Sequence, residues 1–389
     1  MPALTQHSTS ITLFRISAAM FLNYLTIGIP LVMLPLYVQQ QLHLSDLLIG
    51  IAVGSQFIAT LLTRGAAGRK ADTSGGRRTV ITGQFYCAAS GLLMLVSLIA
   101  HPVPLLAWAI MIVGRVLLGI GESFILTGNL TWGMWLAGST HAGQVISWNG
   151  MATYGALAIG APLGLSLYAR AGLALPALLV VLLPIIASGV IYGIPGNIPT
   201  ARPRVPVLRV VGLVWRPGTG LVLQGIGFAT NLSAFTALWF NERHWDNTGF
   251  AMTLFGIAFI AVRFFCAKFP DRYGGATVAT FSLLVEGTGL AVMWAAPSAG
   301  AALIGAAITG CGCSLMFPSL GVEVVRRVPP EIRGTALGVW SAFQDLAYGF
   351  TGPIAGLLTP FIGYQQVFLL AAACALLGAA VVHLLLRQH

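Results

Sequence analysis

Charge is scarce in this chain. Only 8% of its 389 residues are Asp, Glu, Lys or Arg, whereas 57% are hydrophobic. A soluble domain carries about 25% charged residues. With a mean hydropathy of +0.87, the chain has too few charges to cover a water-facing surface, so we predict an all-α polytopic protein of the lipid bilayer. Its net charge of +10 does not indicate nucleic-acid binding, because Lys and Arg occur in short clusters between apolar runs.

Groups suited to enzymatic or metal chemistry are also lacking. The five cysteines lie within apolar runs, and Cys311 and Cys313 point to different sides of a helix, where they do not easily share a metal. The seven histidines fall in termini, loops or span ends, and no P-loop motif occurs. We therefore predict no catalytic residue, no cofactor, no bound metal and no enzymatic activity, with ion gradients rather than ATP as the source of energy.

Apolar runs divide the chain regularly. A helix needs about 20 apolar residues to cross a bilayer, and twelve runs qualify, at roughly 15–38, 46–64, 79–100, 104–127, 142–168, 171–194, 217–241, 249–267, 276–296, 300–323, 334–359 and 364–386. A Pro-rich basic stretch at 196–218 separates six runs from six. We predict two six-helix bundles, over 1–195 and 217–389, joined by a cytoplasmic linker over 196–216.

The basic residues predict the orientation. Seventeen Lys and Arg residues fall on one side of this arrangement, whereas Arg170 and Arg243 fall on the other. Because cytoplasmic loops carry the excess of positive charge, both termini are expected in the cytoplasm.

A charged, glycine-rich segment occurs twice. The stretch "RGAAGRKADTSGG" at 64–76 aligns without gaps with "RFFCAKFPDRYGG" at 263–275, so that Asp72 matches Asp271 and Gly75 matches Gly274. Both copies follow the second predicted span of their half. Such an internal repeat is typical of transporter folds.

These residues resemble the major facilitator superfamily of transporters. The motif G-x-x-x-D-x-x-G with following basic residues is formed by Gly68, Asp72, Gly75, Arg77 and Arg78. The segment "RVLLGIGES" at 115–123 resembles the superfamily's fourth-helix motif. A loosened form of its fifth-helix antiporter motif is "GALAIGAPLG" at 155–164, which contains Gly160, Pro162 and Gly164. The segments "NYLTIGIPLVMLP" and "FPSLGVEVV" resemble sequences of the bacterial YhhS/YfcJ-type group. This group is similar to drug and sugar-efflux permeases.

The resemblance implies a cytoplasmic gate. Asp72 is expected to face the start of the eleventh helix, near 334–336, where Arg333 stands and where Glu323 and Glu331 are close in sequence. A carboxylate at a helix N-terminus is stabilised by about 0.3–1 kcal/mol. By pseudo-symmetry, Asp271 would face the start of the fifth helix near 141–143. Arg64, Gly68, Gly75, Arg77 and Arg78 complete the predicted ionic latch; alternatively, these charges only fix the topology.

Charged residues inside predicted spans are candidates for proton coupling, because each costs about 2.5–3.5 kcal/mol at a helix centre. Arg115 and Glu122 are seven residues apart and share a helical face, and Asp345 lies in the eleventh span. A structural ion pair is the alternative for the first two. Glu286, in the ninth span, is as consistent with packing or a lipid-side position as with function.

Polar residues within spans predict a substrate cavity, because helices 1, 4, 7 and 10 line it in the superfamily that the chain resembles. The candidates are Asn23, Thr26, Tyr37, Gln224, Asn231 and Tyr348. Interhelical hydrogen bonding is the alternative role for such side chains.

The sequence thus favours a monomeric, proton-coupled antiporter of the bacterial inner membrane that exports a small molecule by alternating access. A proton symporter or a facilitative importer of the same fold is the alternative.

Overall fold

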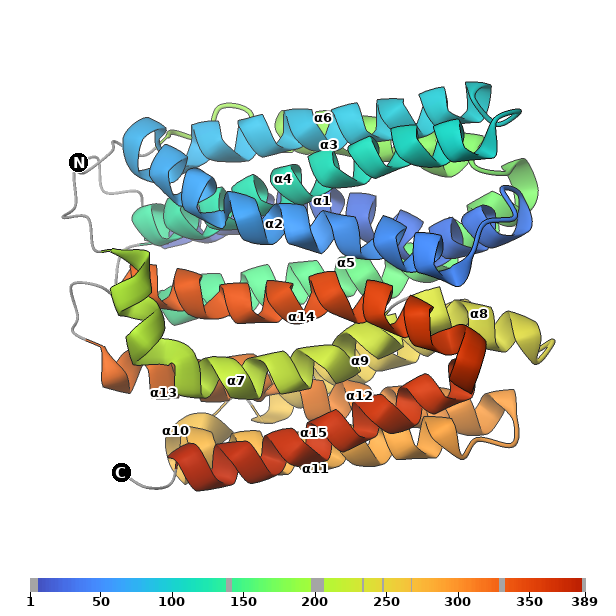
Figure 1. The fold of residues 1–389 in the computed structure, drawn as a ribbon. Helices are drawn as coiled ribbons and strands as arrows, with labels where there is room; N and C mark the ends of the chain where they lie inside the picture. The colour runs from blue at the N-terminus through green and yellow to red at the C-terminus, as the bar shows by residue number, and fades with distance from the viewer. Residues whose placement is uncertain are drawn as a thin grey trace. The chain divides into compact units, whose positions relative to one another are not determined.

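The computed structural model describes residues 6–137, 142–196, 206–232, 234–246, 248–266, 268–328 and 333–386. The regular elements in these ranges are all helices (Figure 1), namely α1 Gln6–Gln40, α2 Asp46–Ser74, α3 Gly76–Ile99, α4 Pro104–Ala137, α5 Ala142–Ala171, α6 Ala174–Val190, α7 Val207–Leu232, α8 Ala234–Glu242, α9 Thr248–Cys266, α10 Phe269–Tyr273, α11 Gly275–Trp294, α12 Ala299–Ser314, α13 Met316–Arg327, α14 Arg333–Ile362 and α15 Tyr364–Leu386. The prediction of an all-α protein is confirmed.

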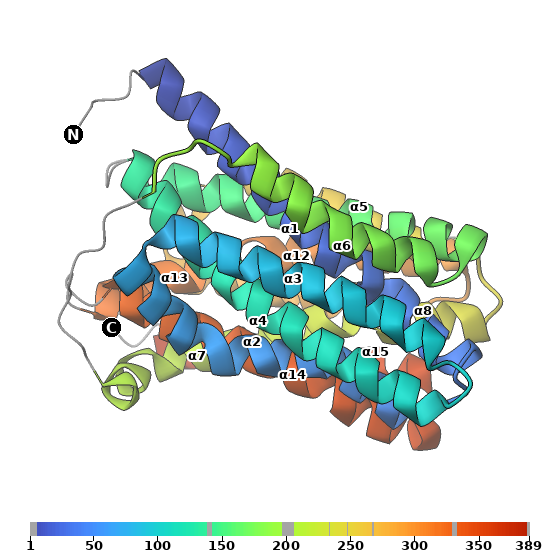
Figure 2. The same ribbon diagram turned by 90° about the horizontal axis from the view of Figure 1, so that it is seen from above.

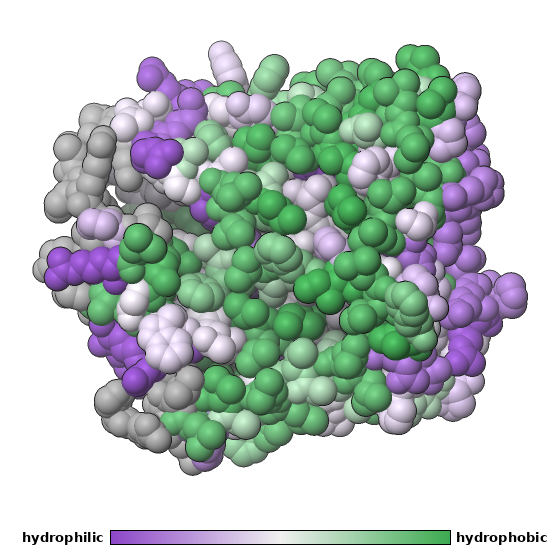
Figure 3. Space-filling model, viewed as in Figure 1, coloured by the Kyte–Doolittle hydropathy of each residue, from purple (hydrophilic) through white to green (hydrophobic). Residues whose placement is uncertain are grey.

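The helices account for the twelve predicted spans. Among the described residues, ten helical stretches are long and apolar enough to cross a membrane, and two of them combine α7 with α8 and α12 with α13. The shorter apolar helix α6 and the 30-residue helix α14 supply the other two. The five-residue helix α10 is additional. On the face drawn in Figure 3, apolar side chains cover the middle lengths of the helices, and hydrophilic ones gather near their ends.

Four helix boundaries differ from those predicted by nine or ten residues. Helix α1 begins at Gln6 rather than at 15, and α4 ends at Ala137 rather than at 127. The other two boundaries lie in charged segments. Helix α2 does not end near residue 64 but continues through the charged segment to Ser74. Helix α7 begins at Val207 rather than at 217, so that the second half of the predicted linker is helical. In both places charged residues interrupt the apolar run without ending the helix.

The chain forms two compact units. The first comprises residues 1–33 and 59–203, and the second comprises residues 34–58 and 204–389. Helices α1 and α2 therefore each contribute to both units. The predicted boundaries at 195 and 217 remain a prediction about the two bundles.

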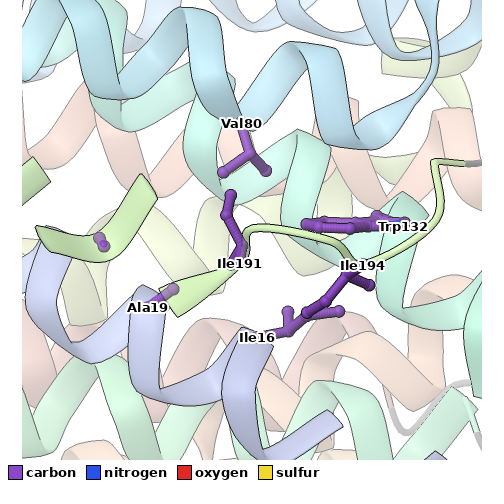
Figure 4. Packing of buried hydrophobic residues seen from close by; sticks show 7 residues of the cluster. Ile16, Ala19, Val80, Trp132, Ile191 and Ile194 are labelled. Atoms are coloured by element: carbon purple, nitrogen blue, oxygen red, sulfur yellow. The ribbon is translucent and has the colours of Figure 1, made fainter. Parts of the chain in front are cut away.

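In the first unit, α3 packs along α4 and α6 (Figure 2). At one end of this packing a cluster of buried apolar side chains joins α1, α3, α4 and the segment after α6. Figure 4 shows it around the ring of Trp132, with Ile16, Val80 and Ile194 nearby. Arg15 Nη2 also donates to the Tyr192 carbonyl oxygen over 2.7 Å, and its Nε donates to the Val190 carbonyl oxygen over 3.0 Å. These bonds satisfy carbonyl groups at the C-terminal end of α6.

The α3–α4 hairpin of the first unit has a counterpart, the α11–α12 hairpin of the second. A Cβ added to Gly114 would lie 3.3 Å from the Ser90 carbonyl oxygen, and one added to Gly305 would lie 2.9 Å from that of Gly289. Ser90 and Gly289 are 199 positions apart, the offset of the repeated charged segment, whereas Gly114 and Gly305 are 191 apart. The same interhelical contacts therefore occur in both units.

The offsets of 199 and 191 differ by eight residues. The first hairpin has these eight additional residues at its tip, where its two helices are joined. Helix α3 has 24 residues, whereas α11 has 20. Pro104 precedes Gly114 by ten residues, whereas Ala299 precedes Gly305 by six. Each helix of the first hairpin is thus longer by four residues, which is about one turn.

Candidate functional site

The repeated charged segment has the same backbone conformation in both copies. Gly75 ends α2 with φ 86° and ψ 154°, and Gly274 ends α10 with φ 85° and ψ 140°. This region of conformational space is essentially restricted to glycine. Each glycine lets the chain reverse and begin the next helix, α3 or α11, at the following residue. The glycine that follows, Gly76 or Gly275, makes a close packing contact.

That packing contact is also duplicated. A Cβ on Gly76 would lie 2.6 Å from the Gly128 carbonyl oxygen and 2.7 Å from Trp132 Cβ, both on α4. A Cβ on Gly275 would collide with the Ser319 carbonyl oxygen and lie 3.0 Å from Glu323 Oε1, both on α13. The glycine pairs therefore fix the start of α3 and of α11 against the neighbouring helix.

Three charged residues of the predicted latch lie on helices. Asp72 belongs to α2, Asp271 to α10, and Arg333 is the first residue of α14. Their side chains, like Glu331 and His141, lie outside the described set. The latch therefore stays a prediction.

Other members of the predicted gate are described. Glu323 is buried, and its carboxylate is 3.1 Å from Arg327 Nη1 and 3.7 Å from Arg326 Nη1, within α13. Arg64 and Arg77 are partly exposed and Arg78 is exposed. Around Gly68, a Cβ would meet no atom within 4 Å. This glycine is therefore not required by packing in the described structure.

The coupling candidates on α4 are buried in the first unit. Arg115 is 1% exposed and Glu122 is 8% exposed, and the two interact electrostatically. The Thr60 hydroxyl of α2 lies 3.4 Å from Glu122 Oε2 and 3.0 Å from the Gly119 carbonyl oxygen, and it can donate to either. The thiol of Cys87, on α3, lies beside the same carboxyl group.

The residues of the predicted antiporter motif pack closely on α1. A Cβ on Gly160 would lie 2.9 Å from the Gly28 Cα atom, and one on Gly164 would collide with the Ile29 carbonyl oxygen. Pro162 lies inside α5 between them. Small residues at such spacing let two helix backbones approach each other closely. The motif thus forms a tight α1–α5 contact within the first unit.

Two cavity candidates lie together in the second unit. Gln224 Oε1 of α7 accepts a hydrogen bond of 3.5 Å from Gln344 Nε2 of α14. Tyr348, one turn after Gln344, stacks on Phe228 of α7 with ring centroids 5.0 Å apart. Asp345 is buried on the same helix. This polar and aromatic contact between α7 and α14 includes Gln344, which the sequence pattern did not single out.

The other cavity candidates are distributed between the two units. Asn23 and Thr26 are buried in the first, whereas Tyr37 belongs to the second. The side-chain amide of Asn23 is enclosed and has no hydrogen-bond partner among the described residues. Asn231 lies on α7, but its side chain is outside the described set.

The sequence model of the Major Facilitator Superfamily matches residues 16–248 and, a second time, residues 218–389. The chain belongs to this superfamily. Over 387 residues it is 40% identical to an uncharacterized MFS-type transporter of Burkholderia mallei, covering 98% of this chain and 94% of the relative. Over 375 residues it is 39% identical to the uncharacterized MFS-type transporter YhhS of Escherichia coli, covering 95% and 91%.

Solved superfamily structures share the fold. A D-xylose-proton symporter superimposes with a TM-score of 0.78 at 16% identity, covering 96% of both chains. The human organic anion transporter MFSD10 superimposes with a TM-score of 0.71 at 14% identity, covering 96% of this chain and 99% of the other. The protein is therefore a multi-pass membrane transporter with the twelve-helix MFS fold.

The environment of Glu286 in this MFS transporter differs from one that the sequence allowed. Glu286 was compatible with a lipid-side position, but it is 0% exposed, and a Cβ on Gly227 of α7 would collide with its carboxyl group. Periodicity could not reveal this, because α11 is apolar on every face and its packing partners come from five other helices.

Proposed function

We propose that this transporter couples the exit of a small molecule to the entry of protons. The observation that carries the proposal is the buried Arg115 and Glu122 on α4, with Thr60 beside the carboxylate. An arginine cannot lose its proton in a protein, whereas a carboxylate can. Protonation of Glu122 would therefore leave an uncompensated cation, which changes the electrostatic balance of the first unit.

Burial makes this change energetically large. Removing one partner of a buried ion pair typically costs about 3–5 kcal/mol. A proton that binds Glu122 acts in the same direction, because it removes the negative charge that interacts with Arg115 while Arg115 keeps its positive one. Protonation could thus favour one conformation over another, which is the requirement for coupling.

The α1–α5 contact supports export. Gly160 and Gly164 bring α5 against α1 with no space for a side chain between the backbones, and the fifth-helix motif to which they belong is similar to that of antiporters. A tight contact here would restrict leak of protons while the substrate leaves. Asn23, whose enclosed amide offers a donor and an acceptor, is our candidate for substrate binding on α1.

We further propose a monomer in the bacterial inner membrane with both termini in the cytoplasm. The Lys and Arg clusters in alternate loops support this orientation. It places Asp72 and Asp271 at the cytoplasmic ends of α2 and α10, as parts of a gate that opens and closes during alternating access. Asp72→Asn and Asp271→Asn should each shift the balance between the inward-open and outward-open states, measured by distance distributions between spin labels on the two sides.

Proton flux into proteoliposomes tests the coupling. The wild type would be reconstituted with an interior pH dye, and a cationic drug, a sugar and a zwitterionic metal chelator would be added in turn. We expect one of them to trigger proton movement in the direction opposite to its own. Glu122→Gln and Asp345→Asn should each abolish this movement, whereas Glu242→Gln, at an exposed acid, should leave it unchanged.

Two results would contradict the proposal. Proton movement in the same direction as the substrate would establish symport. Substrate flux that ignores the pH gradient and survives both substitutions would make the protein a facilitator.

A further inference from the structure

Glu286 is enclosed between three helices of the second unit. It lies in the middle of α11, is 0% exposed, and touches Gly227 of α7. On α12, a Cβ on Gly312 would lie 2.7 Å from the Glu286 Cα atom. Gly227 leaves the space that the carboxyl group fills, and Gly312 lets the backbones of α11 and α12 approach each other closely at Glu286.

The groups around this carboxyl group are polar but neutral. The Cys313 thiol of α12 and the Gln224 amide of α7 are within polar contact of it. Neither carboxyl oxygen has a hydrogen bond of good geometry to a nitrogen or oxygen donor among the described residues. Gln224 in turn contacts Gln344 of α14 over 3.5 Å.

No described basic side chain faces Glu286. The helices packed on α11 are α7, α10, α12, α13 and α15. Their basic residues, with the residue that caps α10, are Arg209, Arg216, Lys268, Arg272, Arg326, Arg327 and His383, and every one of them is at least partly exposed. The nearest along α7, Arg216, is eleven residues before Gly227, which corresponds to about 16 Å of helix. These helices carry two other acids. Glu323 of α13 packs at Gly275, the opposite end of α11 from its tip and eleven residues before Glu286. Asp271 of α10 precedes Gly275 in the sequence, and its side chain is outside the described set.

The first unit contains the same pair of residue types in exchanged positions. Cys87 of α3 corresponds to Glu286 by the offset of 199, and Glu122 of α4 corresponds to Cys313 by the offset of 191. Each pair is brought together by a glycine preceding the residue on the second helix: Gly121 contacts Cys87, and Gly312 contacts Glu286. A thiol and a carboxyl group thus occupy equivalent positions in both units. In the second unit they are in polar contact, whereas in the first the Cys87 thiol interacts electrostatically with Glu122 and has its polar contact with Thr26.

The two sites differ in charge compensation. Glu122 has Arg115 on its own helix, whereas the residue equivalent to Arg115 in the second unit is Ala306, which is fully buried. An ionised carboxylate without a partner is very costly in an apolar interior, and such a group becomes neutral instead.

We propose that Glu286 is a second proton-binding site, which holds a proton in the resting transporter with Cys313 and Gln224 as its partners. Its O–H bond breaks when water reaches Gln224 from the substrate cavity, and the proton passes to that water. Retention of the proton follows from the geometry alone. Its release during transport rests on the proposed function.

Infrared spectroscopy of the purified wild type and of Glu286→Gln tests the retained proton without any substrate. We expect the difference spectrum to contain the carbonyl band of one protonated carboxylic acid, which shifts in heavy water. Cys313→Ser should move the band, because a hydroxyl group bonds to the acid more strongly than a thiol. Glu242→Gln, at an exposed acid, should leave the band unchanged. Identical spectra for the wild type and Glu286→Gln at neutral pH would overturn the proposal.

An exchange of the two residues provides a second test if Glu286→Gln does not fold. The double variant Glu286→Cys/Cys313→Glu gives the second unit the thiol and carboxyl positions of the first, with Ala306 still in place of an arginine. We expect it to fold and to keep the band, whereas Glu286→Cys alone loses it. A band that persists in Glu286→Cys would belong to another acid and would refute the assignment.

Proton release is tested in the proteoliposomes described above. Substrate-triggered proton movement that is reduced at least twofold in Glu286→Gln supports release, and movement that is unchanged overturns it. Absence of any substrate-coupled proton movement in the wild type would refute the proposed function and the release step, while the infrared result would still decide whether the proton is held.

Discussion

The contact between α1 and α5 can be tested by adding one methyl group. In Gly160→Ala the new Cβ would lie 2.9 Å from the Gly28 Cα atom and 3.0 Å from the Ile29 nitrogen. These neighbours are backbone atoms of α1, so no side chain can rotate away. The helices must therefore move apart by a few tenths of an ångström along this face. Overpacking of this kind typically costs about 1–3 kcal/mol.

Gly189 provides a matched control for the same chemical change. It is an exposed residue of α6 in the same unit, and a Cβ there would meet no atom within 4 Å. Replacing a helical glycine with alanine stabilises a helix by about 0.5–1 kcal/mol. Gly160→Ala and Gly189→Ala should therefore change the free energy of unfolding with opposite signs.

Thermal unfolding in detergent, followed by tryptophan fluorescence, measures this difference. We expect Gly160→Ala to melt several degrees below Gly189→Ala, and Gly28→Ala to resemble Gly160→Ala. Combining Gly28→Ala with Gly160→Ala should cost less than the sum of the single changes, because the first methyl group has already separated the helices. In proteoliposomes, Gly160→Ala should raise passive proton leak.

The argument about this contact would be refuted by a Gly160→Ala variant that is at least as stable as Gly189→Ala and leaks no more than the wild type. Full additivity of the two α1–α5 substitutions would also contradict it, since it would mean that the two methyl groups do not share one interface.

Further predictions concern the repeated charged segment and the first helix. Gly75→Ala and Gly274→Ala should each lower stability by about 1–3 kcal/mol, because an L-residue is strained at that φ and ψ; equal melting temperatures for variants and wild type would contradict this. Gly76→Ala should impair folding, measured as the yield of monodisperse protein, whereas Gly68→Ala should fold normally, and the reverse order would refute the packing argument. Arg15→Ala should lower the melting temperature, because the carbonyl groups at the end of α6 lose charged hydrogen bonds, each typically worth about 1.5–3 kcal/mol when buried and less at this partly exposed site; an unchanged melting temperature would show that water replaces them.

Much of the fold could be predicted from the sequence. The apolar runs and the offset of 199 are direct consequences of the bilayer and of an internal repeat, and they led to the all-α, two-part membrane fold. The superfamily was inferred from the resemblance of the motif around Asp72. The boundaries of α2 and α7 could not be predicted, because hydropathy marks where a helix leaves the apolar layer and not where it ends. A helix that continues through a charged segment, as α2 does to Ser74, carries no hydropathy signal there.

The candidate site was less predictable, because it depends on contacts between helices. Arg115 and Glu122 could be found as charges in a span, but Thr60 beside Glu122 is an ordinary polar residue of α2. Glu286 was visible as a charge, yet its neighbours come from α7 and α12, which are distant in sequence. The offset of 191 between α4 and α12 would have indicated that Cys313 is the counterpart of Glu122. This offset can be recognised only once the packing glycines of the two hairpins are matched.

The extra turn on each helix of the α3–α4 hairpin changes the length of the hairpin without changing the register of its interhelical contacts. Adding about one whole turn leaves a helix presenting the same face, so the hairpin can grow longer while its glycine contacts stay in register. The added turns end in apolar side chains, with Ile99 82% exposed and Leu105 61% exposed. The shorter hairpin ends in Ala295, Pro297 and Ser298. We therefore expect each hairpin to set its own immersion depth in the bilayer, with the apolar tip of the longer one at the level of the lipid headgroups.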